Sequence, residues 1–449
     1  MKLWASIVLA GILMGECGLA ADSSRAVESW WTGSGATGDW FGARDTLEDH
    51  GLTLGGKWLG TVYGVVGGGL EHRATFDEEL KFEGRLDFEK LTGSELLKGL
   101  SAVGGVRLRD GTNVNNYVGA SPAFNPSSYQ GGMEWRLLPF YLTYTTPELF
   151  GIRNLLTVSG GWQNPYEFFA RQEDAKLFRN NVIVSGKGIS SNGVGWSSSY
   201  GAWGGTLKVV PCDWSYAQGG VYMAIPGDTT TSNHGLELAG AQPWDSNGWY
   251  VLGETGVTPK ISGLPGKFAV GGYYWGIENT AFCGTESDGK YGFYAMAEQT
   301  FYREPVPAAA VSGGKTDGKS HVVSSPAPKD SKQGLRWLGF VNFAPKANNA
   351  MPFFFYTGLV YEGLIPTRDR DQAGIAFAFG DYSPDQIDAA HEAGNQIVDT
   401  YEGVLEFEYR VQVNKWAFVQ PFAQYVIRPG GDGQVANATV LGVHFGVTF

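Results

Sequence analysis

Apolar residues at every second position, sustained over long stretches, constrain this chain more than any other feature of its sequence. The last ten residues, VLGVHFGVTF, are the clearest case. Small or polar residues separate the apolar ones, which are Leu441, Val443, Phe445, Val447 and Phe449. Side chains of a β-strand point alternately to its two faces, so this period predicts a strand with one apolar face.

The same period recurs in four other stretches, and some of their polar faces carry several charges of both signs. The stretches are KFEGRLDFEK (81–90), GLSAVGGVRLRDG (99–111), YEGVLEFEYRVQV (401–413) and WAFVQPFAQYVIRPGG (416–431). A soluble β-sandwich also alternates, because one face of each sheet meets the core and the other meets water. These runs, however, exceed the ~5–6 residues usual in globular strands and match the ~9–11 residues of a tilted membrane-spanning strand. Together with the charges, their length favours a barrel with a water-filled lumen.

Counting the candidate strands gives about sixteen, and single-chain bacterial outer-membrane barrels have an even number. Both chain ends then lie on the periplasmic side, where the connections are mostly short, and the longer connections lie outside. We therefore predict an all-β fold, a transmembrane antiparallel β-barrel of about sixteen strands with a short N-terminal helical segment. The strands are expected near 54–68, 81–90, 98–110, 136–146, 154–162, 198–210, 213–225, 247–258, 267–277, 291–303, 335–344, 352–363, 372–380, 401–413, 416–428 and 439–449.

Two segments precede the barrel. Residues 1–20 have the features of a signal peptide, namely Lys2, a short apolar run and the small-residue cleavage site GLA-A. Residues 21–52 form an N-terminal periplasmic segment. Within it, GDWFGARDTLEDHG predicts one short helix that Asp39 caps and Gly51 closes.

Composition and motifs exclude several classes of function. The net charge of −12 argues against a nucleic-acid partner. GSGATG (33–38) matches a dinucleotide-binding fingerprint but lacks the strand–helix–strand unit that this fingerprint requires. The histidines show no metal-ligand spacing, and we predict no catalytic residues, no cofactor and no metal. The many carboxylates leave a glycosidase pair open, and the sequence does not decide whether Cys212 and Cys283 form a disulfide.

Aromatic residues are abundant, with 15 Trp, 21 Tyr and 26 Phe. Most are expected at the two membrane interfaces, where aromatic side chains form girdles around barrels. Trp162 and Trp196 lie in or beside the long connection 163–197. An aromatic face can stack on the C–H face of a sugar, so both are candidate substrate contacts as well as candidate girdle residues.

Three segments resemble the carbohydrate-selective porins of the OprB family. They are TGDWFGARDTLEDHGLTLGGK, RDRDQAGIAFAFGDYSPD, and the C-terminal strands with their Gln-Pro and Pro-Gly-Gly landmarks and final Phe449. The resemblance implies a sixteen-stranded bacterial outer-membrane barrel that passes monosaccharides, glucose among them, by facilitated diffusion. It also implies contact with outer-membrane lipid and recognition of Phe449 by the barrel-assembly machinery. Porins occur as monomers and as trimers, so a homotrimer is one of two open arrangements.

In such porins, charged residues and especially arginines line a narrow constriction. On the matching strands these are Arg85, Arg107 and Arg109, with Glu83 beside them. We expect the three guanidiniums to point into one sector of the lumen, and the connection 112–135 to fold inward there. The alternative is that these arginines only pair with other side chains of the barrel and hold the pore open. The competing function is a non-transporting barrel, either a surface-binding protein or an outer-membrane enzyme.

The barrel domain, 53–449, contains one unusual connection, 303–334, which is rich in Pro, Ser, Ala and Lys and is predicted to be a flexible insertion, either a harmless one or a tether. Deleting 303–334 should leave membrane insertion and ion conductance largely intact, because segments of this composition make few contacts. Protease added outside intact cells should not cut it. External cleavage there would mean that the strand count after residue 335 is wrong by an odd number.

Overall fold

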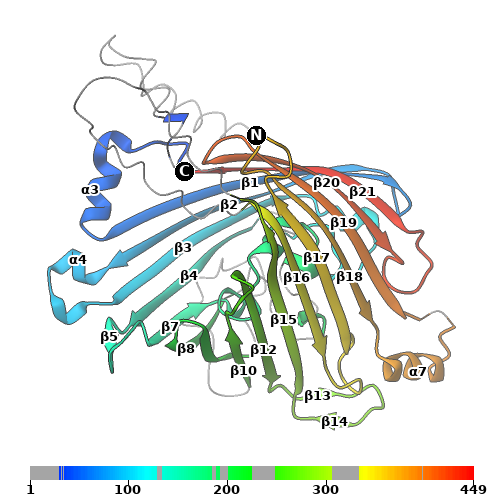
Figure 1. Ribbon diagram of the computed structural model, residues 1–449. Coiled ribbons are helices and arrows are strands. Elements are labelled where there is room, and N and C mark those ends of the chain that lie inside the picture. The colour runs from blue at the N-terminus through cyan, green and yellow to red at the C-terminus, as the bar shows by residue number, and fades with distance from the viewer. Residues whose placement is uncertain are drawn as a thin grey trace.

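Sixteen long antiparallel strands close into a barrel in the computed structural model (Figure 1), as the sequence predicts. The ring closes where the first strand, β1, pairs with the last, β21; Val62 lies opposite Val443 in that register. Closure leaves no strand edge, and so no row of unpaired backbone groups, in the hydrocarbon region. The structure describes residues 30–31, 33, 35–128, 134–184, 189–192, 201–224, 248–305, 333–396 and 398–449.

Each long strand pairs with its neighbour in the chain. The sixteen are β1 (Leu52–Gly67), β2 (Ala74–Asp87), β3 (Leu100–Gly111), β4 (Glu134–Thr145), β7 (Leu156–Gln163), β8 (Ala202–Cys212), β9 (Ser215–Met223), β10 (Trp249–Val257), β12 (Leu264–Trp275), β15 (Lys290–Arg303), β16 (Gly334–Phe343), β17 (Phe353–Glu362), β18 (Gln372–Asp381), β19 (Tyr401–Gln412), β20 (Ala417–Ile427) and β21 (Ala438–Thr448).

Short elements occupy the connections between these strands. The helices and 3₁₀ turns are η1 (Trp40–Gly42), α3 (Ala43–Asp49), α4 (Phe88–Thr92), η2 (Glu95–Leu97), α5 (Asn115–Val118), η3 (Pro165–Glu167), η4 (Asp174–Leu177), α6 (Asn181–Val184), η5 (Ser190–Asn192) and α7 (Pro384–Glu392). The short strands are β5 (Glu148–Leu149), β6 (Ile152–Arg153), β11 (Lys260–Ile261), β13 (Asn279–Thr280) and β14 (Glu286–Ser287). Among the described residues, no helix has the length and hydrophobicity needed to cross a bilayer.

The two ends of the barrel differ in what they carry. Helices α3 and α4 lie at the end where β1 begins and β21 finishes, and α7 with β13 and β14 lies at the other end (Figure 1). The connection from β15 to β16 starts and finishes at the α3 end, although residues 306–332 within it lie outside the described residues. Cys212 ends β8 at the α3 end, whereas Cys283 lies between β13 and β14 at the α7 end. Both thiols are free.

Two sequence predictions about element bounds are wrong. The strand expected at 81–90 starts at Ala74, because the acidic stretch before residue 81 pairs with β1, and it ends at Asp87, where α4 begins. The N-terminal helix begins at Ala43 rather than at Asp39. Phe41, inside η1, and Gly42, which follows it, have left-handed backbones with φ of 59° and 85°, and these prevent one continuous helix.

The predicted apolar faces point outward, away from the lumen. On β21, Leu441 and Val443 are 47% and 39% exposed. His444, which follows Val443 and points to the other face of the strand, is 2% exposed. Aromatic rings of neighbouring strands also pack against one another near the α7 end, with centroid distances of 5.3 Å for Phe343–Phe353, 6.0 Å for Phe355–Phe379 and 5.7 Å for Phe379–Tyr401. An apolar outer wall with aromatic rows is the surface that lipid covers in outer-membrane barrels.

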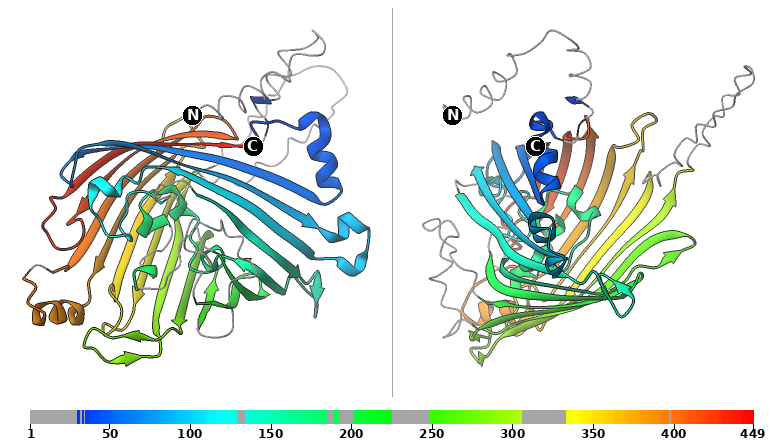
Figure 2. Two further views of the ribbon diagram at one scale, coloured as in Figure 1. Left: turned by 180° about the vertical axis from the view of Figure 1, so that it is seen from behind. Right: turned by 90° about the vertical axis from the view of Figure 1, so that its left-hand side faces the viewer.

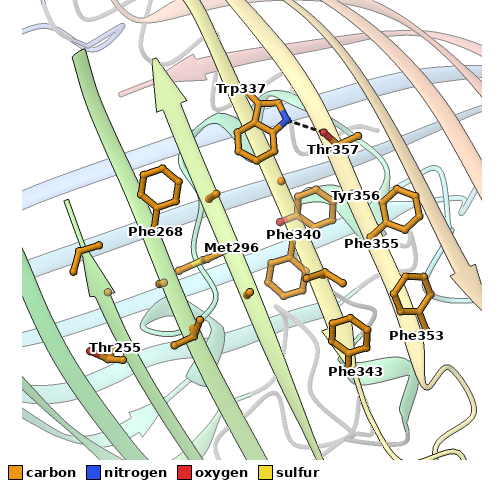
Figure 3. A pocket seen from close by; sticks show the side chains of 18 residues that line it. Thr255, Phe268, Met296, Trp337, Phe340, Phe343, Phe353, Phe355, Tyr356 and Thr357 are labelled. Atoms are coloured by element: carbon orange, nitrogen blue, oxygen red, sulfur yellow. Dashed lines mark hydrogen bonds between the residues drawn. The ribbon is translucent and has the colours of Figure 1, made fainter. Parts of the chain in front are cut away.

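A groove of about 830 Å³ lies on this outer wall, across β12, β15, β16 and β17 (Figure 3). Small residues form its floor, and larger apolar side chains such as Phe268, Phe343 and Phe355 stand around it. Trp337 donates its indole N–H to Thr357 Oγ1 at 2.8 Å, which satisfies the one polar group of that side chain on an apolar surface. The groove is therefore part of the lipid-facing wall rather than a site for a polar solute.

The outward orientation of Val443 gives a test of the barrel surface. Val443→Arg should lower the free energy of unfolding by about 2–4 kcal/mol, because it places a charge against lipid near the middle of a spanning strand. Thr53→Arg, on the lumen face of β1, should change it by less than about 0.5 kcal/mol. Urea unfolding in lipid vesicles measures both values. Equal costs at the two positions would contradict the assignment of inner and outer faces.

Candidate functional site

Two connections fold into the lumen instead of staying at the barrel mouth. We call residues 112–128 the first inward segment and residues 164–184 the second inward segment. Phe124 of the first and Phe169, Phe178 and Ile183 of the second are fully buried. Seen from the α3 end, the helical turns of these segments lie inside the ring of strands (Figure 2). The barrel interior is therefore partly filled by a packed core, and the open space is reduced to polar cavities.

The inward course of the first segment is the one that the sequence predicts. The second was expected only as a long external connection, so sequence reasoning missed it. A signal was present, since this connection contains the apolar groups Phe168–Phe169, Leu177–Phe178 and Val182–Val184. Large apolar side chains at that density are unusual for a solvent-exposed loop and indicate a segment that packs against something.

Carboxylates of the barrel strands hold the second inward segment through its backbone. Glu254 on β10 accepts a hydrogen bond from the Ala170 amide at 2.8 Å, and Glu298 on β15 accepts one from the Asp174 amide at 3.0 Å. Glu406 on β19 accepts one from the Arg179 amide at 2.7 Å. Charge-assisted bonds of this kind are stronger than bonds between neutral groups. Because they come from separate parts of the ring, they fix the segment across the lumen.

A polar cavity of about 460 Å³ lies between the second inward segment and strands β2 to β4. Its volume is in the range of small-molecule sites, ~300–1,000 Å³. Four cationic and two acidic residues line it, together with three tyrosines. They are Lys81, Arg107, Arg171, Lys176, Glu83, Glu167, Tyr141, Tyr166 and Tyr356. This combination offers donors, acceptors and aromatic faces within one small space.

Arg107 connects the barrel to the inward segment at this cavity. Its Nη2 lies 3.1 Å from Glu167 Oε1, and both side chains are largely buried. Lys81, which lies opposite Arg107 in the register of β2 and β3, pairs with Glu83. The predicted residues Arg107 and Glu83 therefore lie on one cavity, each with an oppositely charged neighbour.

Arg109 and Arg85 have different positions from Arg107. Arg109 is buried and pairs with Glu79 across the strands at 2.7 Å. Arg85 lies opposite Val103, four residues from Arg107 and hence about 13 Å along the strand at ~3.3 Å per residue. The three arginines thus share one sector of the lumen, as expected, but they do not lie at one level.

Of the two candidate tryptophans, Trp162 and Trp196, the structure describes only the first. Trp162 is 1% exposed and packs against Trp203, with ring centroids 5.9 Å apart. No face of its ring is open to a solute in this arrangement, so its observed contacts are those of a packing residue. Trp196 lies outside the described residues.

The surroundings shift the pKa values of two ionisable groups in the second inward segment, Tyr166 and Glu173. Burial raises the pKa of the Tyr166 hydroxyl, so this side chain is neutral at physiological pH. Burial also acts to raise the pKa of Glu173, but the hydrogen bond and charge of Lys176 outweigh it and lower this pKa below its ordinary value. Glu173 is therefore ionised at neutral pH and keeps its contact with Lys176.

A second polar cavity, of about 530 Å³, shares Lys176 with the first. Charged residues of both signs also line it, and these are Glu173, Asp174, Lys176, Lys267, Glu298, Arg303, Arg336, Glu362 and Arg410. Arg336 bonds to Asp174 of the inward segment at 2.9 Å. Polar cavities on both sides of one segment are the arrangement expected where a solute passes a constriction.

Comparisons with known proteins agree with this geometry. Residues 71–449 match the family described as "Carbohydrate-selective porin, OprB family". The chain belongs to this family. It is 25% identical to Porin B of Pseudomonas aeruginosa strain PAO1, over 98% of this chain and 96% of the relative. The high-pH structure of Pseudomonas putida OprB has a TM-score of 0.78 at 23% identity, covering 93% of this chain and 99% of that one. The low-pH structure has a TM-score of 0.56 at 18% identity, covering 93% and 98%.

Family and fold together identify a channel of the bacterial outer membrane through which carbohydrates diffuse into the periplasm. Within the described part of the chain, His, Cys, Asp and Glu side chains form no group that could hold a metal ion. Because the family and the fold indicate a channel, the cavities of the lumen are the candidate site of function.

Proposed function

We propose that this porin selects monosaccharides, glucose among them, at the constriction between strands β2 and β3 and the second inward segment. The observation that carries the proposal is the cavity at Arg107 and Glu167, where charged and aromatic side chains surround a space of about 460 Å³. Arg85, Arg109, Glu83, Trp162 and Trp196 are the other residues that sequence reasoning connects with substrate. Of these, Glu83 lines the same cavity.

The chemistry of this cavity suits a small polyhydroxylated solute. A guanidinium presents donors in a fixed planar fork, and a carboxylate accepts from hydroxyl groups, so the pair can replace water around a sugar. Tyrosine rings supply faces for the apolar side of the sugar ring. The cations and carboxylates already pair with each other, so a sugar competes for them and is not held tightly. A passage site must bind strongly enough for entry and weakly enough for release.

A liposome-swelling series with sugars of increasing size tests the proposed selectivity. Monosaccharides should cause swelling and disaccharides should cause little, because the constriction admits one ring at a time. Planar bilayers with refolded protein provide the control for channel formation. An absence of open-channel current would support the competing hypothesis of a non-transporting barrel, which binds or modifies molecules at the outer membrane. Equal swelling by all sugars would support an unselective pore.

Arg107→Ala is the sharpest single test of the constriction. Removing this side chain opens the Arg107–Glu167 contact, so single-channel conductance should rise and block by glucose should weaken, by about tenfold in the blocking constant for a loss of ~1.4 kcal/mol. Arg153→Ala is the matched control, because Arg153 is exposed in the short β5–β6 turn. Unchanged sugar block in Arg107→Ala would place selectivity elsewhere. Arg109→Ala is less informative, since it leaves Glu79 buried without its partner and destabilises the barrel.

We also propose that the barrel-assembly machinery recognises the final strand through Phe449. The strand is apolar on its outer face, and the Phe449 ring stacks near Phe82, with centroids 6.2 Å apart. Phe449→Ala should lower the amount of folded protein in the outer membrane while leaving refolding in detergent intact. Heat-modifiable mobility on gels measures folding in both settings. The homotrimer is a second assembly proposal, and chemical cross-linking in native membranes distinguishes it from a monomer.

A further inference from the structure

Three buried polar residues connect both inward segments to the barrel at one place. They are Asn180 of the second inward segment, Glu406 of β19 and Gln424 of β20, and we call them the hub. Their exposed fractions are 0%, 0% and 1%. None of the three lines either of the two polar cavities described above. The hub therefore lies outside both cavities, and its effect on a solute in either of them must come through other residues.

Hydrogen bonds join the three hub residues directly. Asn180 Nδ2 donates to Gln424 Oε1 at 3.1 Å, and Gln424 Nε2 donates to Glu406 Oε1 at 2.9 Å. The carboxylate of Glu406 also accepts from the backbone amides of Arg179 and Asn180, at 2.7 and 3.1 Å. Each hub side chain thus donates or accepts at more than one atom, which fixes its rotamer.

The same side chains reach the first inward segment. Asn180 Nδ2 donates to the Phe124 carbonyl at 3.0 Å, and Gln424 Nε2 donates to the Pro126 carbonyl at 3.1 Å. Beside them, the Asn181 backbone N–H donates to the Asn125 carbonyl at 3.0 Å, and the Asn181 side-chain Nδ2 donates to the Pro122 carbonyl at 3.0 Å. Two segments far apart in the sequence therefore share one set of partners. Displacing either segment would break bonds that the other segment also uses.

Burial makes this arrangement sensitive to small chemical changes. A polar group that loses its partner in such a place has no water to replace it, so the loss favours movement of the segment. Glu254 and Glu298 hold the segment at other places, so the movement is a local opening around Asn180. The second inward segment carries Glu167, Arg171 and Lys176 into the first cavity. Movement at the hub would thus change the width and charge of the constriction.

We propose that Asn180, Glu406 and Gln424 are positioning residues that set the pore size by holding both inward segments. This proposal rests on the proposed sugar-channel function and adds residues that do not touch the sugar. It differs from a purely structural role in one respect: the barrel strands pair along their whole length without the hub, so its loss should alter selectivity while the barrel stays folded.

Glu406→Gln is the first test, because it keeps the shape of the side chain but replaces an acceptor oxygen with a donor that faces other donors. Single-channel conductance should rise about twofold or more, and a disaccharide should now swell liposomes, as local opening of the segment widens the pore. Asn180→Ala is the second variant. This substitution lies in the inward segment and changes no strand. It therefore tests the proposal even if Glu406→Gln fails to fold.

Glu304→Gln is the matched control, because Glu304 lies at the end of β15 and bonds to Tyr361 rather than to an inward segment. Heat-modifiable gel mobility first establishes that each variant is folded. If the wild-type protein conducts ions but admits all sugars equally, the proposed function fails. If the wild type excludes disaccharides and both folded hub variants exclude them equally well at unchanged conductance, the hub proposal is overturned.

Discussion

The structure depends on the hydrogen-bonded seam between β1 and β21. Every backbone N–H and C=O that faces hydrocarbon must find a partner within the protein, since lipid offers none. A sheet of fifteen pairings would still leave two open edges, and the sixteenth pairing removes both. Once the ring is closed, side chains alternate between lipid and lumen, except where an irregularity shifts the register, as between Gly104 and Val106. The charges on β2, β3 and β19 can then lie inside while Leu441 and Val443 lie outside.

The fold was predictable because alternation is a local property of the sequence. The polarity of each residue indicates whether its side chain faces lipid or the lumen, and in a membrane barrel this alternation continues along each strand. The errors fell where that signal was weak or overridden. The acidic start of β2 does not look like a strand, yet its pairing with β1 makes it one. Phe41 interrupts an otherwise helical stretch because its backbone is left-handed, a conformation that a phenylalanine in the sequence does not predict.

The candidate site was less predictable, because its shape comes from contacts between distant segments. Strand parity correctly placed Arg107 and Glu83 on the lumen side, and the register explains why Arg85 lies at a different level. No local sequence pattern indicates that Glu167, which lies in a long connection, forms an ion pair with Arg107. Trp162 illustrates the same limit, since its burial against Trp203 follows from strand pairing and not from its neighbours in the sequence.

The way in which the second inward segment is held has a consequence for how such a channel can change over generations. Glu254, Glu298 and Glu406 bond to backbone amides, and every residue type except proline supplies one. Substitutions on the cavity side of the segment therefore leave these bonds in place. The barrel and these bonds stay the same, and the side chains that line the cavities are free to vary. A channel built in this way can change the lining of its cavities by single substitutions without first losing its fold.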